Sequence, residues 1–219
     1  MLADERFTAF IFDMDGVIID SEPIHSAVKM DTFRHFGIDF SERDLDKYMG
    51  RTSQAIFADV LASQPRPGVT VEDLTRYKHE HYIEVLRSGD IHAIKPTVQL
   101  IHELAAAGMQ LAVATSSWRP VLESVMDRLR LRDCFTALVS GGDLPASKPD
   151  PAIYRLAAQE LGVGADQCAV LEDTENGILA AKRAGMYCIA YRNPHSGTQD
   201  LSAADRIVDS PAEIRPGNI

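Results

Sequence analysis

The feature that most constrains the fold is a regular alternation of apolar runs and helical patterns after Pro96. The apolar runs, which we predict to be buried strands, cover 109–115, 135–140, 168–172 and 187–191. The helical patterns lie between and before them, over 97–107, 120–130, 151–161 and 175–184. Repeated strand–helix units of this length predict an α/β fold with a doubly wound, Rossmann-like parallel sheet and right-handed crossovers.

A second feature is a long stretch, from Ser21 to about Arg87, that carries only helical signals. It separates a first apolar run, 7–12, from the alternating part of the chain. "SERD" (41–44) and "TVED" (70–73) both resemble capping boxes, and Ser21 is expected to cap the first helix. We therefore predict a discontinuous core, residues 1–18 and 94–219, with a helical cap domain inserted at 19–93.

Acidic side chains follow the first apolar run directly. Asp13 and Asp15 stand at its end, and Asp20, expected to end the turn or cap the next helix, comes shortly after. Burial and neighbouring like charges both raise the pKa of a carboxyl group, so such a cluster needs a compensating cation.

Polar side chains also stand at the ends of the other predicted strands. Ligands of an open α/β sheet bind outside the carboxyl ends of its strands, so these residues are expected to share one rim with Asp13 and Asp15. The residues are Thr115 with Ser116 and Ser117, Lys148 in the loop after the predicted strand 135–140, and Glu172 with Asp173.

This set of residue types suits phosphoryl chemistry. Mg²⁺ prefers carboxylate, carbonyl and water oxygens, which Asp13, Asp173 and Glu172 could supply. Asp13 is then an anionic nucleophile toward phosphorus, and Asp15 is near enough to act as general acid and base. Thr115 and the amides after it, including that of Ser116, are expected to hold phosphoryl oxygens, while Lys148 stabilises negative charge in the transition state.

Four motifs, "DMDGVIID", "TSS", "SKPDP" and "EDTENG", resemble the ordered motifs of the haloacid dehalogenase-like superfamily. Up to about Tyr191 the chain is similar to its β-phosphoglucomutase/sugar-phosphatase branch, which carries a helical cap after the first motif. The resemblance implies that Asp13 is the nucleophile and Asp15 the acid/base. It also implies that Mg²⁺ is held by Asp13, the carbonyl of Asp15 and Asp173, with Glu172 a ligand in some relatives.

In the cap we expect three substrate-binding residues, two of which follow from the resemblance. His25 and Lys78 stand where the mutase-like branch carries a histidine and a lysine near the substrate, and Arg51 in "MGRTS" could bind a distal anionic group. The alternative for His25 and Lys78 is an ordinary place on a helix surface.

Three functions remain open at this point. A phosphatase would pass the phosphoryl group from Asp13 to water, a β-phosphoglucomutase would return it to the sugar, and a non-catalytic module would only bind metal or phosphate. Arg51 stands two residues before the position of the mutase arginine, Arg119 replaces an asparagine, and Thr97 replaces a glycine. These departures favour the phosphatase, and we expect its substrate to be a small phosphorylated metabolite of the sugar-phosphate class.

Bulk properties exclude several other classes. The net charge of −10 argues against a nucleic-acid partner, because phosphate backbones attract surplus Lys and Arg. No apolar run approaches the roughly 20 residues that span a bilayer, so no membrane partner is expected. The start "MLADERF" does not resemble a secretory signal, and three cysteines do not make a disulfide framework. We expect a cytoplasmic protein that is a monomer or a weak homodimer.

Overall fold

The computed structural model describes residues 6–48, 52–89 and 91–219. The chain forms two compact units, one made of Met1–Asp20 and Ile91–Ile219 and the other of Ser21–Asp90. These borders lie close to those expected at 18/19 and 93/94. The role of the second unit as a cap stays a prediction.

The first unit is built on a six-stranded sheet in which all neighbouring strands pair in parallel. The strands are β1 (Ala9–Phe12), β2 (Gln110–Thr115), β3 (Ala137–Ser140), β4 (Cys168–Glu172), β5 (Tyr187–Tyr191) and β6 (Arg206–Val208). Their order across the sheet is β3-β2-β1-β4-β5-β6. The α/β fold class is confirmed. The edge strand β6 was not predicted, because its three residues are too few to show a periodic pattern.

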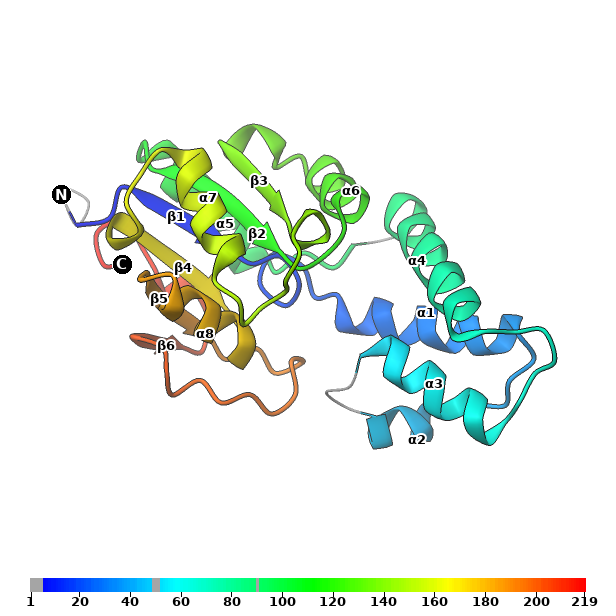
Figure 1. Ribbon diagram of the computed structural model, residues 1–219. Helices are drawn as coiled ribbons and strands as arrows, with labels where there is room; N and C mark the ends of the chain where they lie inside the picture. The colour runs from blue at the N-terminus through cyan, green and yellow to red at the C-terminus, as the bar shows by residue number, and fades with distance from the viewer. Residues whose placement is uncertain (1–5, 49–51, 90) are drawn as a thin grey trace. The chain divides into compact units, whose positions relative to one another are not determined.

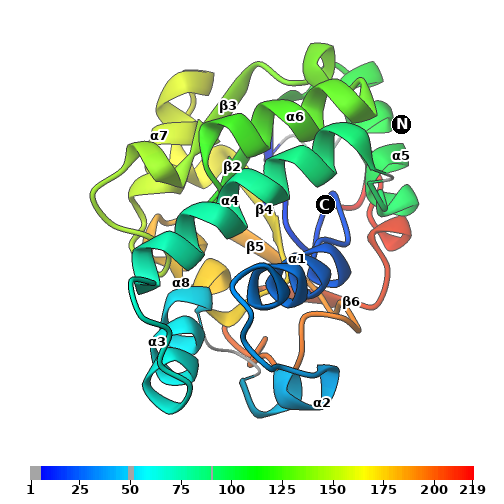
Figure 2. The same ribbon diagram turned by 90° about the vertical axis from the view of Figure 1, so that its right-hand side faces the viewer.

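Helices cover both faces of this sheet (Figure 1, Figure 2). Their bounds are α5 (Lys95–Ala106), α6 (Arg119–Leu129), α7 (Ala152–Leu161) and α8 (Glu175–Arg183). The helices α7 and α8 pack on the face that carries Ala9 and Ile11 of β1, where Tyr154 is fully buried. Right-handed crossovers place α5 and α6 on the opposite face, because the chain moves from β1 through β2 to β3 in one direction across the sheet.

The second unit is helical. It contains α1 (Glu22–His35), α2 (Glu42–Leu45), α3 (Ser53–Ser63) and α4 (Val71–Ser88). Its apolar core joins α1, α3 and α4 through Phe33, Phe57 and Leu74, all of which are at most 1% exposed. Short 3₁₀ turns complete the two units at Asp46–Tyr48, Arg132–Cys134, Gly141–Asp143, Ala165–Gln167 and Pro211–Glu213.

The structure describes the helix N-caps at Ser21 and at Thr70, two of the three that the sequence predicted in the second unit. Thr70 and Asp73 form a reciprocal capping box at the start of α4, as predicted. The prediction for Ser21 was wrong: it stands at the N-cap of α1 with a helical backbone (φ −88°, ψ −18°), and its side chain makes no capping bond. An N-cap side chain reaches the free amides from an extended backbone, which Ser21 does not adopt.

The strand order brings the acidic ends of β1 and β4 together. After β1 the chain builds β2 and β3 on one side, then returns to place β4 on the other, so β1 and β4 flank the switch point where ligands of such sheets bind. Phe12 pairs with Leu171, so the next residues, Asp13 and Glu172, stand side by side at the carboxyl ends of the two strands.

Candidate active site

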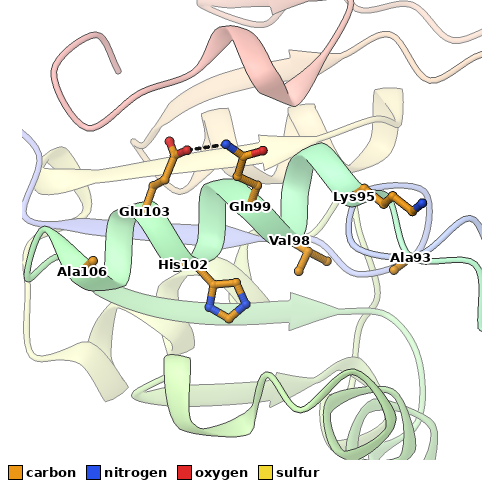
Figure 3. A pocket seen from close by; sticks show the side chains of 7 residues that line it. All are labelled: Ala93, Lys95, Val98, Gln99, His102, Glu103 and Ala106. Carbon is orange, nitrogen blue, oxygen red and sulfur yellow. Dashed lines mark hydrogen bonds between the residues drawn. The ribbon is translucent and has the colours of Figure 1, made fainter.

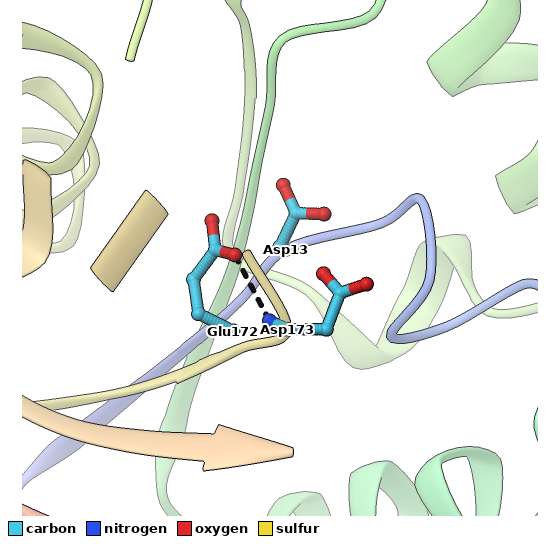
Figure 4. Close-up of side chains that lie close together, drawn as sticks. All are labelled: Asp13, Glu172 and Asp173. Carbon is cyan, nitrogen blue, oxygen red and sulfur yellow. Dashed lines mark hydrogen bonds between the residues drawn. The ribbon is translucent and has the colours of Figure 1, made fainter. Parts of the chain in front are cut away.

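Three acidic side chains and one lysine meet at the carboxyl ends of β1 and β4. The carboxylates of Asp13, Glu172 and Asp173 are buried, and one oxygen of each lies within 4.8 Å of the others (Figure 4). Lys148 donates to Asp13 Oδ1 at 2.5 Å, to Glu172 Oε1 at 2.6 Å and to the carbonyl of Ala114 at 3.1 Å. The structure therefore brings the predicted lysine onto the predicted acids.

Glu172 uses both of its carboxylate oxygens in bonds to the protein. Oε1 accepts from Lys148 and from the hydroxyl of Tyr154 at 2.7 Å. Oε2 accepts from the amide of Asp173 at 3.0 Å and from the amide and hydroxyl of Thr174 at 3.2 and 3.1 Å. A carboxylate held by this many donors has a fixed orientation, and in turn it fixes Lys148.

Asp15 lies against the turn after β2. Its Oδ2 accepts from the hydroxyl of Ser117 at 2.7 Å and from that of Thr115 at 3.3 Å. Thr115 Oγ1 also accepts from the amide of Ser117 at 3.0 Å, so the turn is ordered by its own hydroxyl. The neighbouring Ser116, which the sequence singled out, is exposed. The side chain of Ser117, rather than that of Ser116, reaches the acid.

Asp173 is 2% exposed and sits against a glycine and a serine from distant parts of the chain. Its Oδ2 accepts a hydrogen bond from Ser196 Oγ. Gly16, with φ +79°, is so near that a Cβ at this position would lie 2.0 Å from Asp173 Oδ2. Only glycine suits this backbone and leaves room for the carboxylate.

The pKa values divide the cluster into two pairs of residues. Glu172 and Lys148 favour each other's charged form, whereas Asp13 and Asp173 have raised pKa values. Burial alone would raise the pKa of Glu172 and lower that of Lys148, but their mutual attraction outweighs it: the pKa of Glu172 is lowered and that of Lys148 is raised. Burial raises the pKa of Asp13 well above its ordinary value despite Lys148. Burial, followed by the charge of Glu172, raises the pKa of Asp173 to about 7.

The donor set fits a hard divalent cation. Asp173 Oδ1 is buried and has no hydrogen-bond partner among the described residues, which is costly for a carboxylate oxygen unless something positive faces it. The raised pKa values of Asp13 and Asp173 show that their anionic forms lack enough positive charge around them, and a divalent cation would supply that charge. Oxygen ligands of this kind are the ones that Mg²⁺ takes.

Two of the three substrate-binding residues predicted in the cap, His25 and Lys78, lie within hydrogen-bond distance of each other in the second unit. Lys78 Nζ lies 3.2 Å from His25 Nδ1, and the His25 ring stacks on Tyr82 with centroids 4.3 Å apart. Lys78 is only 7% exposed, which is unusual for a lysine on a helix and does not fit an ordinary surface position. Arg51 lies outside the described residues.

Asp20 was expected to end the turn or to cap the next helix, and it does not stand at the N-cap of α1, which is Ser21. Its Oδ2 lies 2.7 Å from Nδ1 of His195, in the segment after β5, and its amide donates to the carbonyl of His92 at 2.8 Å. Asp20 therefore joins the two connections between the units, on the side of the first unit.

A groove lies apart from this cluster, along the outer side of α5 (Figure 3). No residue predicted for the site lines it. The lining residues are Ala93, Lys95, Val98, Gln99, His102, Glu103 and Ala106.

None of the helices in the described ranges combines the length and apolar character that crossing a membrane requires.

Several residues of the cluster carried no sequence signal. Tyr154 lies in the first turns of α7 and reads as an ordinary core residue, while Ser196 stands in a polar loop. Gly177 was visible inside "EDTENG", but its role was not: a Cβ there would lie 1.8 Å from Glu172 Oε1. Its place in the motif is the one sequence signal that could have marked Gly177 as part of the cluster.

Known proteins resemble this chain along most of its length. A profile of the family described as haloacid dehalogenase-like hydrolase matches residues 10–191. Protein CbbY of Cereibacter sphaeroides is 33% identical, with 94% of this chain and 93% of the relative covered. Hexitol phosphatase B of Escherichia coli (strain K12) is 32% identical, covering 90% of this chain and 88% of the relative. A crystal structure of CbbY from Rhodobacter sphaeroides in complex with phosphate matches with a TM-score of 0.82 at 31% identity, covering 94% of this chain and 96% of that chain.

Proposed function

The chain belongs to the haloacid dehalogenase-like hydrolase family, and on that premise we propose that it is a Mg²⁺-dependent phosphohydrolase of a small phosphorylated metabolite. The observation that carries the proposal is the buried group of Asp13, Glu172 and Asp173 around Lys148. Its acids outnumber its one cation, it lies at the switch point of the sheet, and its nucleophile candidate is held in place by the lysine.

The proposed reaction has two displacements at phosphorus. In the first, a carboxylate oxygen of Asp13 forms a bond to phosphorus while the bond to the leaving alcohol oxygen breaks, and Asp15 gives that oxygen a proton. In the second, Asp15 takes a proton from water, whose oxygen bonds to phosphorus as the bond to Asp13 breaks. Inorganic phosphate leaves and both aspartates return to their starting states.

The surrounding residues keep these groups in place. Ser117 and Thr115 hold Asp15 Oδ2, so its proton-transfer position depends on the turn after β2. Lys148 stays charged between Asp13 and Glu172 and counters the negative charge that grows on the phosphoryl oxygens. We propose that Ser116 contributes its exposed turn to phosphate binding.

For the metal, we propose Asp13, Asp173 and the backbone carbonyl of Asp15 as ligands. Bound Mg²⁺ would supply charge neutralisation for the acids and for the phosphoryl group. Because both oxygens of Glu172 are engaged elsewhere, we propose that it orients Lys148 rather than binding Mg²⁺ directly.

The substrate class follows from the relatives rather than from the cluster. The E. coli relative is a hexitol phosphatase and the R. sphaeroides structure contains phosphate, so we propose a phosphorylated sugar or sugar alcohol. His25, Lys78 and Arg51 of the second unit are the proposed contacts to the rest of that molecule.

One observation favours a second candidate, β-phosphoglucomutase activity. The pair formed by the buried Lys78 and the half-buried His25 matches the cap residues through which the chain resembles the mutase branch. A panel of phosphorylated sugars with Mg²⁺, assayed for phosphate release and for conversion of β-glucose 1-phosphate, separates the two. Phosphate release without isomerisation supports the phosphatase, whereas isomerisation that outpaces hydrolysis supports the mutase.

Asp13→Asn tests the nucleophile. The variant should lose all detectable phosphate release and keep the far-ultraviolet circular dichroism spectrum of the parent, because the amide is isosteric but cannot attack phosphorus. Asp133→Asn, which changes an exposed aspartate, is the matched control and should retain full activity. Turnover by Asp13→Asn would remove Asp13 from this role.

A further inference from the structure

The segment that follows β5, residues 192–200, approaches the acidic cluster from a part of the chain that the proposed chemistry leaves unused. Its Asn193 is 7% exposed and donates through Nδ2 to the carbonyl of Gly16 at 2.8 Å. Asn193 Oδ1 in turn accepts from the amide of His195 at 2.8 Å. One buried side chain therefore ties the segment to the turn that follows Asp15.

The same segment is also tied to the start of α8. Gln199 Oε1 accepts from the amide of Glu175, the first residue of that helix, at 3.0 Å. Its Nε2 donates to the carbonyl of Ser196 at 2.8 Å. Ser196 therefore lies between two anchors of the segment, Asn193 before it and Gln199 after it.

Ser196 uses this fixed position to bond Asp173. Its hydroxyl donates to Asp173 Oδ2, and the space beside both atoms is left open by Gly16. The other oxygen, Oδ1, is buried without a hydrogen-bond partner among the described residues. With Oδ2 held by Ser196, the carboxylate cannot rotate freely, and Oδ1 keeps one direction.

We propose that Ser196 is a positioning residue that orients the Asp173 carboxylate for the divalent cation. The proposal rests on the metal site of the proposed function and adds a residue outside the four motifs to it. Partners that orient a metal ligand in this way typically change metal affinity by about 10- to 100-fold when removed.

The test measures Mg²⁺ binding by calorimetry on the full-length protein without substrate, so that it does not depend on turnover. Ser196→Ala should bind Mg²⁺ about 10-fold more weakly than the parent. Ser196→Thr, which keeps the hydroxyl, should recover most of the affinity. Ser202→Ala, which changes an exposed serine just after this segment, is the matched control and should bind as the parent does.

Activity provides a second readout that separates positioning from general damage. Ser196→Ala should raise the Mg²⁺ concentration required for half-maximal phosphate release about 10-fold, with a smaller effect on the rate at saturating Mg²⁺. Its thermal midpoint without Mg²⁺ should stay near that of the parent.

The outcomes distinguish this inference from the proposed function. If the parent binds Mg²⁺ and Asp173→Asn does not, while Ser196→Ala binds like the parent, the positioning role is overturned and the metal site stands. If the parent itself binds no Mg²⁺, or Asp173→Asn binds it unchanged, the metal site fails and the inference fails with it.

Discussion

At the scale of single residues, Glu172 is the most constrained side chain of the cluster. Its carboxylate lies against the first turn of α8, where Gly177 provides the space and Thr174, the N-cap, provides two donors. A Cβ on Gly177 would lie 1.8 Å from Oε1 and 1.9 Å from the carboxylate carbon. The bonds from Lys148 and Tyr154 therefore depend on the absence of one methyl group.

Gly177→Ala should reverse the usual effect of this substitution. Glycine to alanine in a helix normally stabilises by up to about 1 kcal/mol. Here the methyl group must displace Glu172, which breaks buried bonds to a charged group, so we expect a destabilisation of about 1–3 kcal/mol and slower phosphate release. Urea unfolding checks the sign. Gly217→Ala, where nothing lies within 4 Å of the added atom, should be nearly neutral, and a stabilised Gly177→Ala would contradict this account.

At the scale of elements, two helices of the second unit begin in different ways. Thr70, with an extended backbone, accepts from the amide of Asp73 at 3.1 Å, and Asp73 bonds back to the amide of Thr70 at 3.0 Å. Ser21 precedes α1 in a helical conformation and caps nothing with its side chain. Both N-cap residues carry a hydroxyl group, but only that of Thr70 caps its helix, because the backbone conformation at the N-cap decides whether the hydroxyl oxygen reaches a free amide.

Substitution of these two residues should show the difference. Thr70→Ala should cost about 1 kcal/mol and lower the hydrogen-exchange protection of the first turn of α4. Ser21→Ala should leave the protection of the first turn of α1 unchanged. Equal losses of protection in the two variants would mean that capping does not distinguish these helices.

The pH dependence of the second unit has a predictable sign from His79 on α4. Burial, followed by the charge of Lys78, lowers the pKa of His79 below its ordinary value of 6.5. Below that pH the unfolded chain binds a proton that folded His79 does not yet accept, so this contribution to stability falls as the pH falls through about 6.5.

Thermal unfolding of the parent and of His79→Gln at pH 7.5 and 5.5 measures this contribution. The parent should lose more stability than the variant on acidification. A parent and a variant with the same pH dependence would show that His79 titrates alike in both states.

At the scale of the whole molecule, the chain combines a sheet unit interrupted in sequence with a continuous helical unit. The predicted membership in the haloacid dehalogenase-like family and the α/β fold class are confirmed. The acids, the lysine and the segment around Ser196 all belong to the first unit, whereas His25 and Lys78 belong to the second. A ligand of the acidic cluster is therefore expected to stabilise the first unit directly.

Mg²⁺ should reveal this division in hydrogen exchange. At about 100 times its dissociation constant, a ligand that binds only the folded state adds about 2.7 kcal/mol of stability. We expect the added protection in β1, β4 and the segment after β5, with little change at the core of α3 and α4. Asp173→Asn should abolish the added protection. A uniform rise over both units in that variant would point to binding elsewhere.

The sequence alone determined those properties that depend on local order along the chain. The alternating periodicity indicated the α/β fold, and the four motifs at the ends of predicted strands indicated the family and the acids with Lys148. Side-chain periodicity and motif spacing are local, so they can be detected without knowing which elements touch. The short edge strand β6 was too brief for this kind of signal.

Only the tertiary structure decided which side chains complete the cluster. Lys148 reaches Asp13, Glu172 and the carbonyl of Ala114 at once, and Tyr154, Gly177 and Ser196 join them from three different segments. Hydrogen bonds and close approaches of this kind are set by how strands, helices and loops pack in three dimensions. Residue type and spacing do not contain that information, because the partners lie far apart along the chain.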